Sequence, residues 1–137
     1  MKMITIMPDF GNGPYAWIKD ASDDTTYVGG NIADAVDGFK HSGYKVSAAI
    51  EADFAAWMML FGNYSDSPAF DWPAFHRQGI ALTKRLKAEL GDRVRIVYDT
   101  QVEDPSYAMD ARSEVRTEIL DDGSLRPIML CRVAHTE

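Results

Sequence analysis

Two stretches with helical periodicity lie next to each other in the middle of the chain, and strand-forming stretches lie on both sides of them. Apolar residues recur every three to four positions in residues 47–62 and again in residues 71–91. Helices that are grouped, rather than alternating with strands, favour a segregated α+β fold over an alternating α/β fold. This grouping constrains the fold more than any other feature of the sequence.

The stretch at residues 71–91 carries both a start and a stop for a helix. Asp71 is placed to cap the helix, and Pro73 stands in the first turn, where its missing N–H costs no hydrogen bond. Gly91 is placed to end it. We therefore predict a helix over residues 72–90, with an apolar stripe made of Phe75, Gly79, Leu82, Leu86 and Leu90.

The stretch at residues 47–62 is apolar on nearly every side. Ser47 can cap a helix there, and the segment AAWMMLF at residues 55–61 leaves little room for a polar face. A helix that is apolar all round either lies at the centre of the core or packs against a partner. Its periodic positions are Ile50, Phe54, Trp57 and Phe61.

The rest of the chain predicts strands and one further short helix. Asn31 is a good N-cap, and the spacing of Ile32, Val36 and Phe39 predicts two helical turns that end near Gly43. The β-branched or alternating stretches are residues 3–7, 15–19, 25–28, 93–98, 114–120 and 125–132. The predicted fold class is α+β, with a mostly antiparallel sheet of about four to six strands and two main helices packed on one face.

The length of 137 residues fits a single domain spanning residues 1–137. Within it, residues 113–137 predict a C-terminal hairpin that is less firmly held than the rest. Pro127 would confine the second arm of this hairpin to a sheet edge, because proline cannot donate a ladder hydrogen bond.

The net charge of −7 is unevenly distributed along the chain. Residues 72–95 carry six basic and two acidic side chains, whereas the segments on either side are acidic. An acidic chain argues against binding to nucleic acid or to an anionic membrane, since phosphate contacts need many Lys and Arg side chains. No stretch is apolar for the ~20 residues that a membrane helix needs.

The basic residues of the predicted 72–90 helix form a candidate partner-binding face. Arg77, Lys84 and Lys87 fall on the side opposite the apolar stripe. The plain alternative is a solvated helix face, but such faces usually mix both signs of charge, and here Glu89 is the only acid after the cap. The pattern therefore indicates a docking surface for an acidic patch or an anion.

Met58 and Met59 are a second candidate for partner binding. The apolar stripe of the 47–62 helix already uses Trp57 and Phe61, which leaves the two methionines as an adaptable apolar surface. We expect that a homodimer, if one forms, packs through this helix.

Motifs for catalysis or cofactor binding are weak. The single cysteine, Cys131, excludes an internal disulfide, and its apolar neighbours favour an inert side chain. No histidine has zinc-ligand spacing, so no metal or cofactor is predicted. Two clusters of acidic residues are candidate sites. One is Asp34 and Asp37 with His41, and the other is Glu51 with Asp53. A solvated helix face is the better interpretation of each cluster.

The leading interpretation is a non-catalytic, acidic, cytoplasmic domain that binds another protein. Its most concrete form is an immunity or antitoxin-type protein that neutralises a basic partner, since opposite charges accelerate association. Two alternatives stay open. One is a small enzyme with a site built from dispersed residues. The other is a small-molecule or anion-binding module that uses the loop at residues 11–14 or the basic helix.

Overall fold

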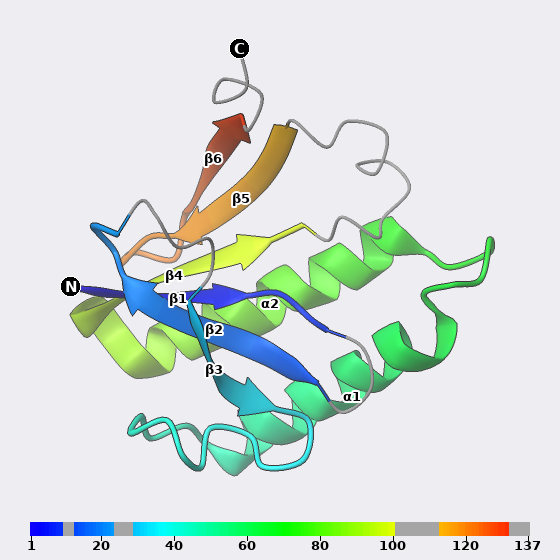
Figure 1. Cartoon of the computed structure of the whole chain (residues 1–137), viewed down its shortest axis with the longest axis horizontal. Helices are drawn as coiled ribbons and strands as arrows, with labels where there is room; N and C mark the ends of the chain where they lie inside the picture. Colours follow the sequence, from blue (N-terminus) through cyan, green and yellow to red (C-terminus); the bar gives the residue numbers. More distant parts are fainter. Residues whose placement is uncertain (10–12, 24–28, 101–112, 132–137) are drawn as a thin grey trace.

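The structure is a computed structural model, and it describes residues 1–9, 13–23, 29–100 and 113–131. Two helices, α1 (Ala48–Tyr64) and α2 (Trp72–Leu90), lie side by side against one sheet (Figure 1). The six strands of the sheet are β1 (Lys2–Ile6), β2 (Pro14–Asp20), β3 (Gly30–Asp34), β4 (Val94–Asp99), β5 (Ser113–Ile119) and β6 (Leu125–Cys131). The predicted α+β class and strand number are confirmed.

The strand order is β3-β2-β1-β4-β5-β6, and every neighbouring pair is antiparallel except β1 with β4. That central parallel pair places Ile4 opposite Ile96. Parallel neighbours need a crossover connection, and here the crossover contains β2, β3 and both helices. The C-terminal hairpin joins the main sheet through β4, and β6 lies at the edge, as Pro127 predicted.

The core lies between the helices and the sheet. Ile4, Ile6 and Ile96 are fully buried on the central strands, and the ring of Phe54 on α1 stacks on that of Tyr15 at 4.7 Å. Trp57 stacks on Phe75 of α2 at 4.6 Å. The β5–β6 end of the sheet extends beyond the two helices (Figure 1).

The helix boundaries follow the caps that the sequence predicts. The Ser47 hydroxyl accepts the backbone N–H of Ile50, and the Asp71 carboxylate accepts that of Ala74. Gly91 ends α2 with φ of 72°, a left-handed value that favours glycine, and the short 3-10 turn η1 (Gly91–Arg93) leads into β4.

The predicted helix at residues 31–43 is wrong. Residues 30–34 form β3 instead, because their backbone pairs with β2. Asp34 does not sit in a helical first turn: its carboxylate accepts the backbone N–H groups of Val36 and Asp37 in an Asx turn. The chain then reverses at Gly38, whose φ is +57°, and Phe39 turns into the core.

Three sequence-based expectations fall outside the described residues. They are the strand at residues 25–28, the first half of the anion-binding loop at residues 11–14, and the end of the C-terminal hairpin beyond residue 131.

Candidate functional site

From Phe54 onward, the outward side of α1 is an exposed helix face without charge. The eleven residues Phe54–Tyr64 contain no charged side chain, although only one side of the helix is buried in the core. Met59 is 63% exposed, Leu60 37% and Tyr64 56%. Large apolar side chains clustered on one surface helix often mark a contact site.

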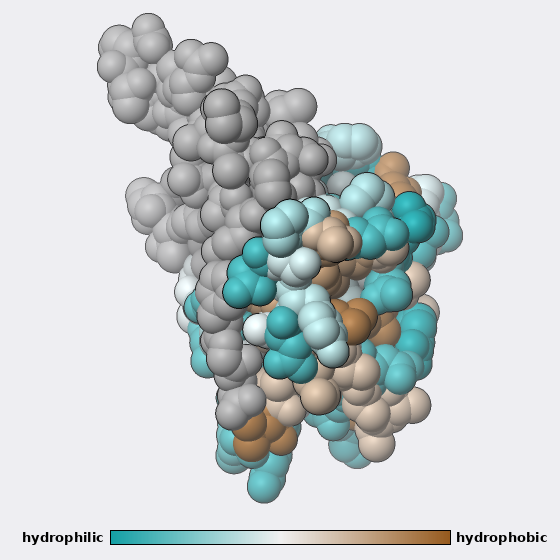
Figure 2. Space-filling model, turned by 90° about the vertical axis from the view of Figure 1, so that its right-hand side faces the viewer, coloured by the Kyte–Doolittle hydropathy of each residue, from teal (hydrophilic) through white to brown (hydrophobic). Residues whose placement is uncertain are grey.

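Two adjoining hollows lie between α1 and α2, and Leu60 and Gln78 line both of them. We call the pair the interhelical groove. Its volumes are about 400 Å³ at the end where α1 passes into α2 and about 420 Å³ further along. Figure 2 faces the former end and shows apolar surface set between hydrophilic groups. The lining of the first hollow includes Tyr64, Phe70 and Phe75, and that of the second includes Ala56, Trp57 and Ala81.

The surface of α2 beside the interhelical groove carries the basic side chains Arg77, Lys84 and Arg85, while the acid Asp71 caps the start of α2 and lines the first hollow. Arg85 lines the groove and pairs with Asp53 of α1 at 2.6 Å, so one ion pair bridges the two helices. Arg77 and Lys84 are exposed. They lie four and three positions from Ala81, which places them on the helix surface beside the groove. Arg77 and Lys84 thus lie at the surface, as the sequence predicts for a docking face.

Met58 and Lys87 are not at the surface, and the expectation that they are exposed is wrong. Met58 is 2% exposed and belongs to the core cluster. Lys87 is 5% exposed. Its ammonium group donates to the carbonyls of Gly91 and Val94, both at 2.9 Å, and pairs with Asp121 at 2.8 Å. The buried side of α2 is wider than the apolar stripe predicted from the sequence, because α2 packs on α1 and also on β4.

Two polar pairs lie near the end of β4, and neither was predicted from the sequence. The imidazole Nδ1 of His76 and the hydroxyl of Tyr98 are 2.7 Å apart. Arg116 donates to the carboxylate of Asp99 at 3.0 Å, and both side chains are buried. These residues do not line the interhelical groove. Alternation along β4 could have flagged Asp99 as a polar residue in a central strand.

The structure shows what the residues of the two candidate acidic clusters contact. Glu51 accepts the backbone N–H of Phe39 at 2.6 Å and so holds the turn at residues 35–43 against α1. Asp53 takes part in the ion pair with Arg85. Asp37 and His41 are exposed and 4.0 Å apart. Among the residues that the structure describes, no three His, Cys, Asp or Glu side chains are grouped so as to hold a metal ion.

A third hollow of about 670 Å³ lies beside the start of α1. Its lining contains side chains of both charges, because Lys40 and Lys45 line it together with Glu51 and Glu89. Glu89 is already engaged there, since its carboxylate accepts the backbone N–H of Ser47 at 2.8 Å. This mixed lining selects neither sign of charge in a ligand.

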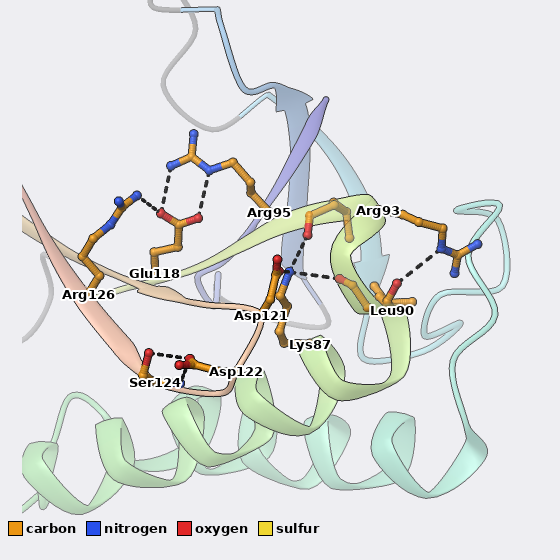
Figure 3. A network of polar contacts seen from close by, with 11 residues as sticks. Lys87, Leu90, Arg93, Arg95, Glu118, Asp121, Asp122, Ser124 and Arg126 are labelled. Carbon is orange, nitrogen blue, oxygen red and sulfur yellow. Dashed lines mark hydrogen bonds and ion pairs between the residues drawn. The ribbon is translucent and has the colours of Figure 1, made fainter.

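A charged network ties the β5–β6 hairpin to β4 (Figure 3). The carboxylate of Glu118 accepts two hydrogen bonds from Arg95, both at 2.9 Å, and one from Arg126. The hydrogen bonds from Arg95 hold the pKa of Glu118 below its usual value, against the opposing effect of burial. The network therefore fastens the hairpin to the rest of the sheet.

Comparison with protein-family models, with curated proteins and with solved structures finds no match for this chain. In the part of the chain that the structure describes, neither helix combines the length and the apolar character that crossing a membrane requires.

Proposed function

We propose that the protein is a non-catalytic protein-binding domain and that its partner docks on the outer face of α1 and α2. The observation that carries the proposal is the exposed side of α1 next to the interhelical groove, which is uncharged from Phe54 onward. Met59, Leu60 and Tyr64 are 37–63% exposed there, whereas burying a large apolar side chain completely contributes about 1.5–3 kcal/mol. A protein surface that covered the exposed part of each side chain would recover a corresponding share of this free energy.

The form of the groove supports a macromolecular partner. Its two hollows are open to solvent along the helix pair rather than enclosed, whereas small-molecule sites bury most of their ligand. Aromatic and aliphatic side chains at the centre with charges at the rim are the usual arrangement of a protein interface. Here the centre is Leu60 and Tyr64, and the rim is Arg77, Lys84 and the Asp53–Arg85 pair.

This face differs in charge from the one expected for an immunity-type protein. Net acidity predicts a basic partner, but the exposed charged side chains beside the groove that have no ion-pair partner among the described residues and form no helix cap, Arg77 and Lys84, are cationic. Neutralisation of a basic partner stays a prediction from composition, and it would need a different surface of the molecule.

Site-specific photo-crosslinking in the source cells tests the proposal. A photoreactive phenylalanine analogue at Met59 would lie on the docking face, and the same analogue at Asp92 would lie at the far end of α2, where the side chain is also exposed. We expect one discrete protein adduct from position 59 and none from position 92.

The control is Leu60→Asp in the position-59 chain. Because Leu60 is 37% exposed, this change should remove the adduct while the free energy of unfolding falls by no more than about 1 kcal/mol. The same adducts from both positions, or an adduct that survives Leu60→Asp, would overturn the proposal.

A further inference from the structure

We infer that the element bound in the interhelical groove is an amphipathic α-helix of the partner, with acidic residues along the edge that faces α2. This inference rests on the proposed protein-binding function. It adds the conformation and the charge of the bound segment.

The shape of the groove fits a helix. The groove follows two packed helices, and α1 lines it from Asp53 to Tyr64, which corresponds to ~18 Å of helix length. A third helix can lie in the groove between two others with its side-chain ridges inserted, as in other helix-in-groove complexes. The two hollows meet at Leu60 and Gln78. They offer consecutive places for apolar anchors from one face of such a helix.

The charges fix the acidic edge of the bound helix. Arg77 and Lys84 have no ion-pair partner among the described residues, whereas Arg85 is already paired with Asp53. The exposed side of α1 from Phe54 onward is uncharged. The two sides of the groove therefore differ: one favours a carboxylate, and the other favours apolar or small side chains.

A second copy of the chain fits this surface less well. In a symmetric dimer the same patch faces itself, and both acids that line the groove are already engaged: Asp53 pairs with Arg85, and Asp71 accepts the backbone N–H of Ala74. Arg77 and Lys84 would then find no free carboxylate on the facing patch. An anionic membrane would suit the cations and the apolar ridge, but it would repel a chain whose net charge is −7.

A displayed library of amphipathic helices tests the inference. Each member is about 16 residues long, which spans ~24 Å. Leucines are fixed on one face, and Glu, Lys, Gln and Ser are randomised at the flanking positions. The library is selected on the wild-type chain and on the double variant Arg77→Glu/Lys84→Glu. Both variant positions are exposed, so the fold should be kept.

We expect Glu to exceed Lys by about tenfold on one flank of the helices selected on the wild-type chain, in low salt. Selection on the double variant should reverse this preference. The wild-type preference should weaken in about 500 mM salt, because exposed ion pairs are screened. Equal flank composition for both chains, or a preference for Lys on the wild-type chain, would overturn the inference.

Two further measurements separate this inference from its rivals. Sedimentation of the wild-type chain at rising concentration would reveal dimers, and co-sedimentation with phosphatidylglycerol vesicles would reveal membrane binding. If Leu60→Asp abolished dimer formation, the face would be a dimer interface. If it abolished vesicle binding, the face would be a membrane-binding surface. Either result would overturn the inference. The library could show no acidic preference while a partner still crosslinks to position 59. That result would keep the proposed protein-binding function and reject only the inferred acidic helix.

Discussion

Two lysines three positions apart on α2 illustrate how differently one residue type can serve the fold. Lys84 is exposed, whereas the buried ammonium group of Lys87 binds two carbonyls where α2 ends and the carboxylate of Asp121 in the β5–β6 turn. Figure 3 shows Lys87 reaching both from the last turns of the helix. Lys87 therefore joins α2, β4 and the hairpin, and it is not available to a partner.

We predict that Lys87→Met lowers the free energy of unfolding by about 2–3 kcal/mol, because it leaves buried carbonyl groups without a donor. Lys84→Met should change it by no more than about 0.5 kcal/mol, as expected for an exposed position. Urea denaturation of the two variants measures both values. Equal losses in the two variants would contradict the assignment of Lys87 to the interior.

Tyr15 is fully buried, and its hydroxyl has no hydrogen-bond partner among the described residues. Burial, followed by the negative charges of Glu51 and Asp34, raises the pKa of its phenol far above the ordinary value. The unfolded chain releases this proton near pH ~10, whereas the folded chain keeps it to higher pH. The related stabilisation is therefore complete below the unfolded pKa and is lost as the pH rises above it.

Tyr15→Phe should accordingly flatten the decline of stability between about pH 9 and about pH 11, where one such group contributes up to ~1.4 kcal/mol per pH unit. At about pH 7 the variant should be as stable as the wild type or slightly more stable, since an unpaired hydroxyl leaves the core. Denaturation curves across this pH range provide the measurement. Parallel declines in both proteins would show that Tyr15 ionises normally in the folded state.

At the scale of elements, Gly79 lets α2 pack closely against Tyr98 of β4 and Trp57 of α1. A Cβ atom built there would lie 2.4 Å from Cε1 of Tyr98 and 2.6 Å from Cζ2 of Trp57. Gly79 belongs to the apolar stripe predicted for this helix. A glycine suits this position because a larger side chain would collide with Tyr98 and Trp57.

We expect Gly79→Ala to destabilise the protein by about 1–3 kcal/mol through overpacking, although alanine is the better helix former by about 1 kcal/mol. Ala88→Gly is the matched control, because residue 88 is exposed on the same helix. The control should lose about 1 kcal/mol from helix propensity alone. A more stable Gly79→Ala variant in thermal or urea unfolding would contradict the close approach of α2 to Tyr98.

The elements that could be predicted from the sequence are those with local signals. Ser47, Asp71 and Gly91 mark helix ends by chemistry that acts within a few residues, so α1 and α2 were predicted closely. Ile32, Val36 and Phe39 have equally helical spacing, yet residues 30–34 form β3 and residues 35–43 form turns. Pairing with β2 and the contact between Phe39 and Glu51 decide that segment, and both arise from distant parts of the chain.

The candidate site was predictable in part for the same reason. The all-round apolar character of residues 55–61 indicated either core or partner contact. The structure shows one side of the helix buried in the core and the other side exposed, so contact with a partner stays a prediction. The width of the buried side was not predictable, since it depends on how α1 and α2 pack together and on the sheet. This is why Met58 and Lys87 were wrongly predicted to be exposed, whereas Met59 and Lys84 are exposed as predicted.

At the scale of the whole molecule, the hairpin is held by charge as well as by its backbone. The carboxylate of Glu118 is 7% exposed and bonded to Arg95 and Arg126, and its pKa is lowered. Its stabilising contribution is present above the unfolded pKa of about 4.3 and is lost as the pH falls through that value toward the lower folded pKa.

Glu118→Gln should therefore lower the free energy of unfolding by about 1–3 kcal/mol at about pH 7 and by much less at about pH 3. The comparison is the difference in urea-unfolding free energy between the wild-type and variant chains at each pH. A difference that is independent of pH would show that the charge of Glu118 does not contribute. Because Arg126 is half exposed, Arg126→Gln should have the smaller effect of the two substitutions.

The parallel pairing of β1 with β4 also constrains the order in which the sheet can form during synthesis. Lys2 pairs with Val94, so β1 leaves the ribosome well before its second neighbour in the sheet exists. Until then β1 has an unpaired edge, and such edges readily recruit other chains. At about 5–20 residues per second the delay lasts several seconds. The central sheet therefore cannot be completed before β4 has been made, and a nascent chain stalled between α2 and β4 still carries this open edge.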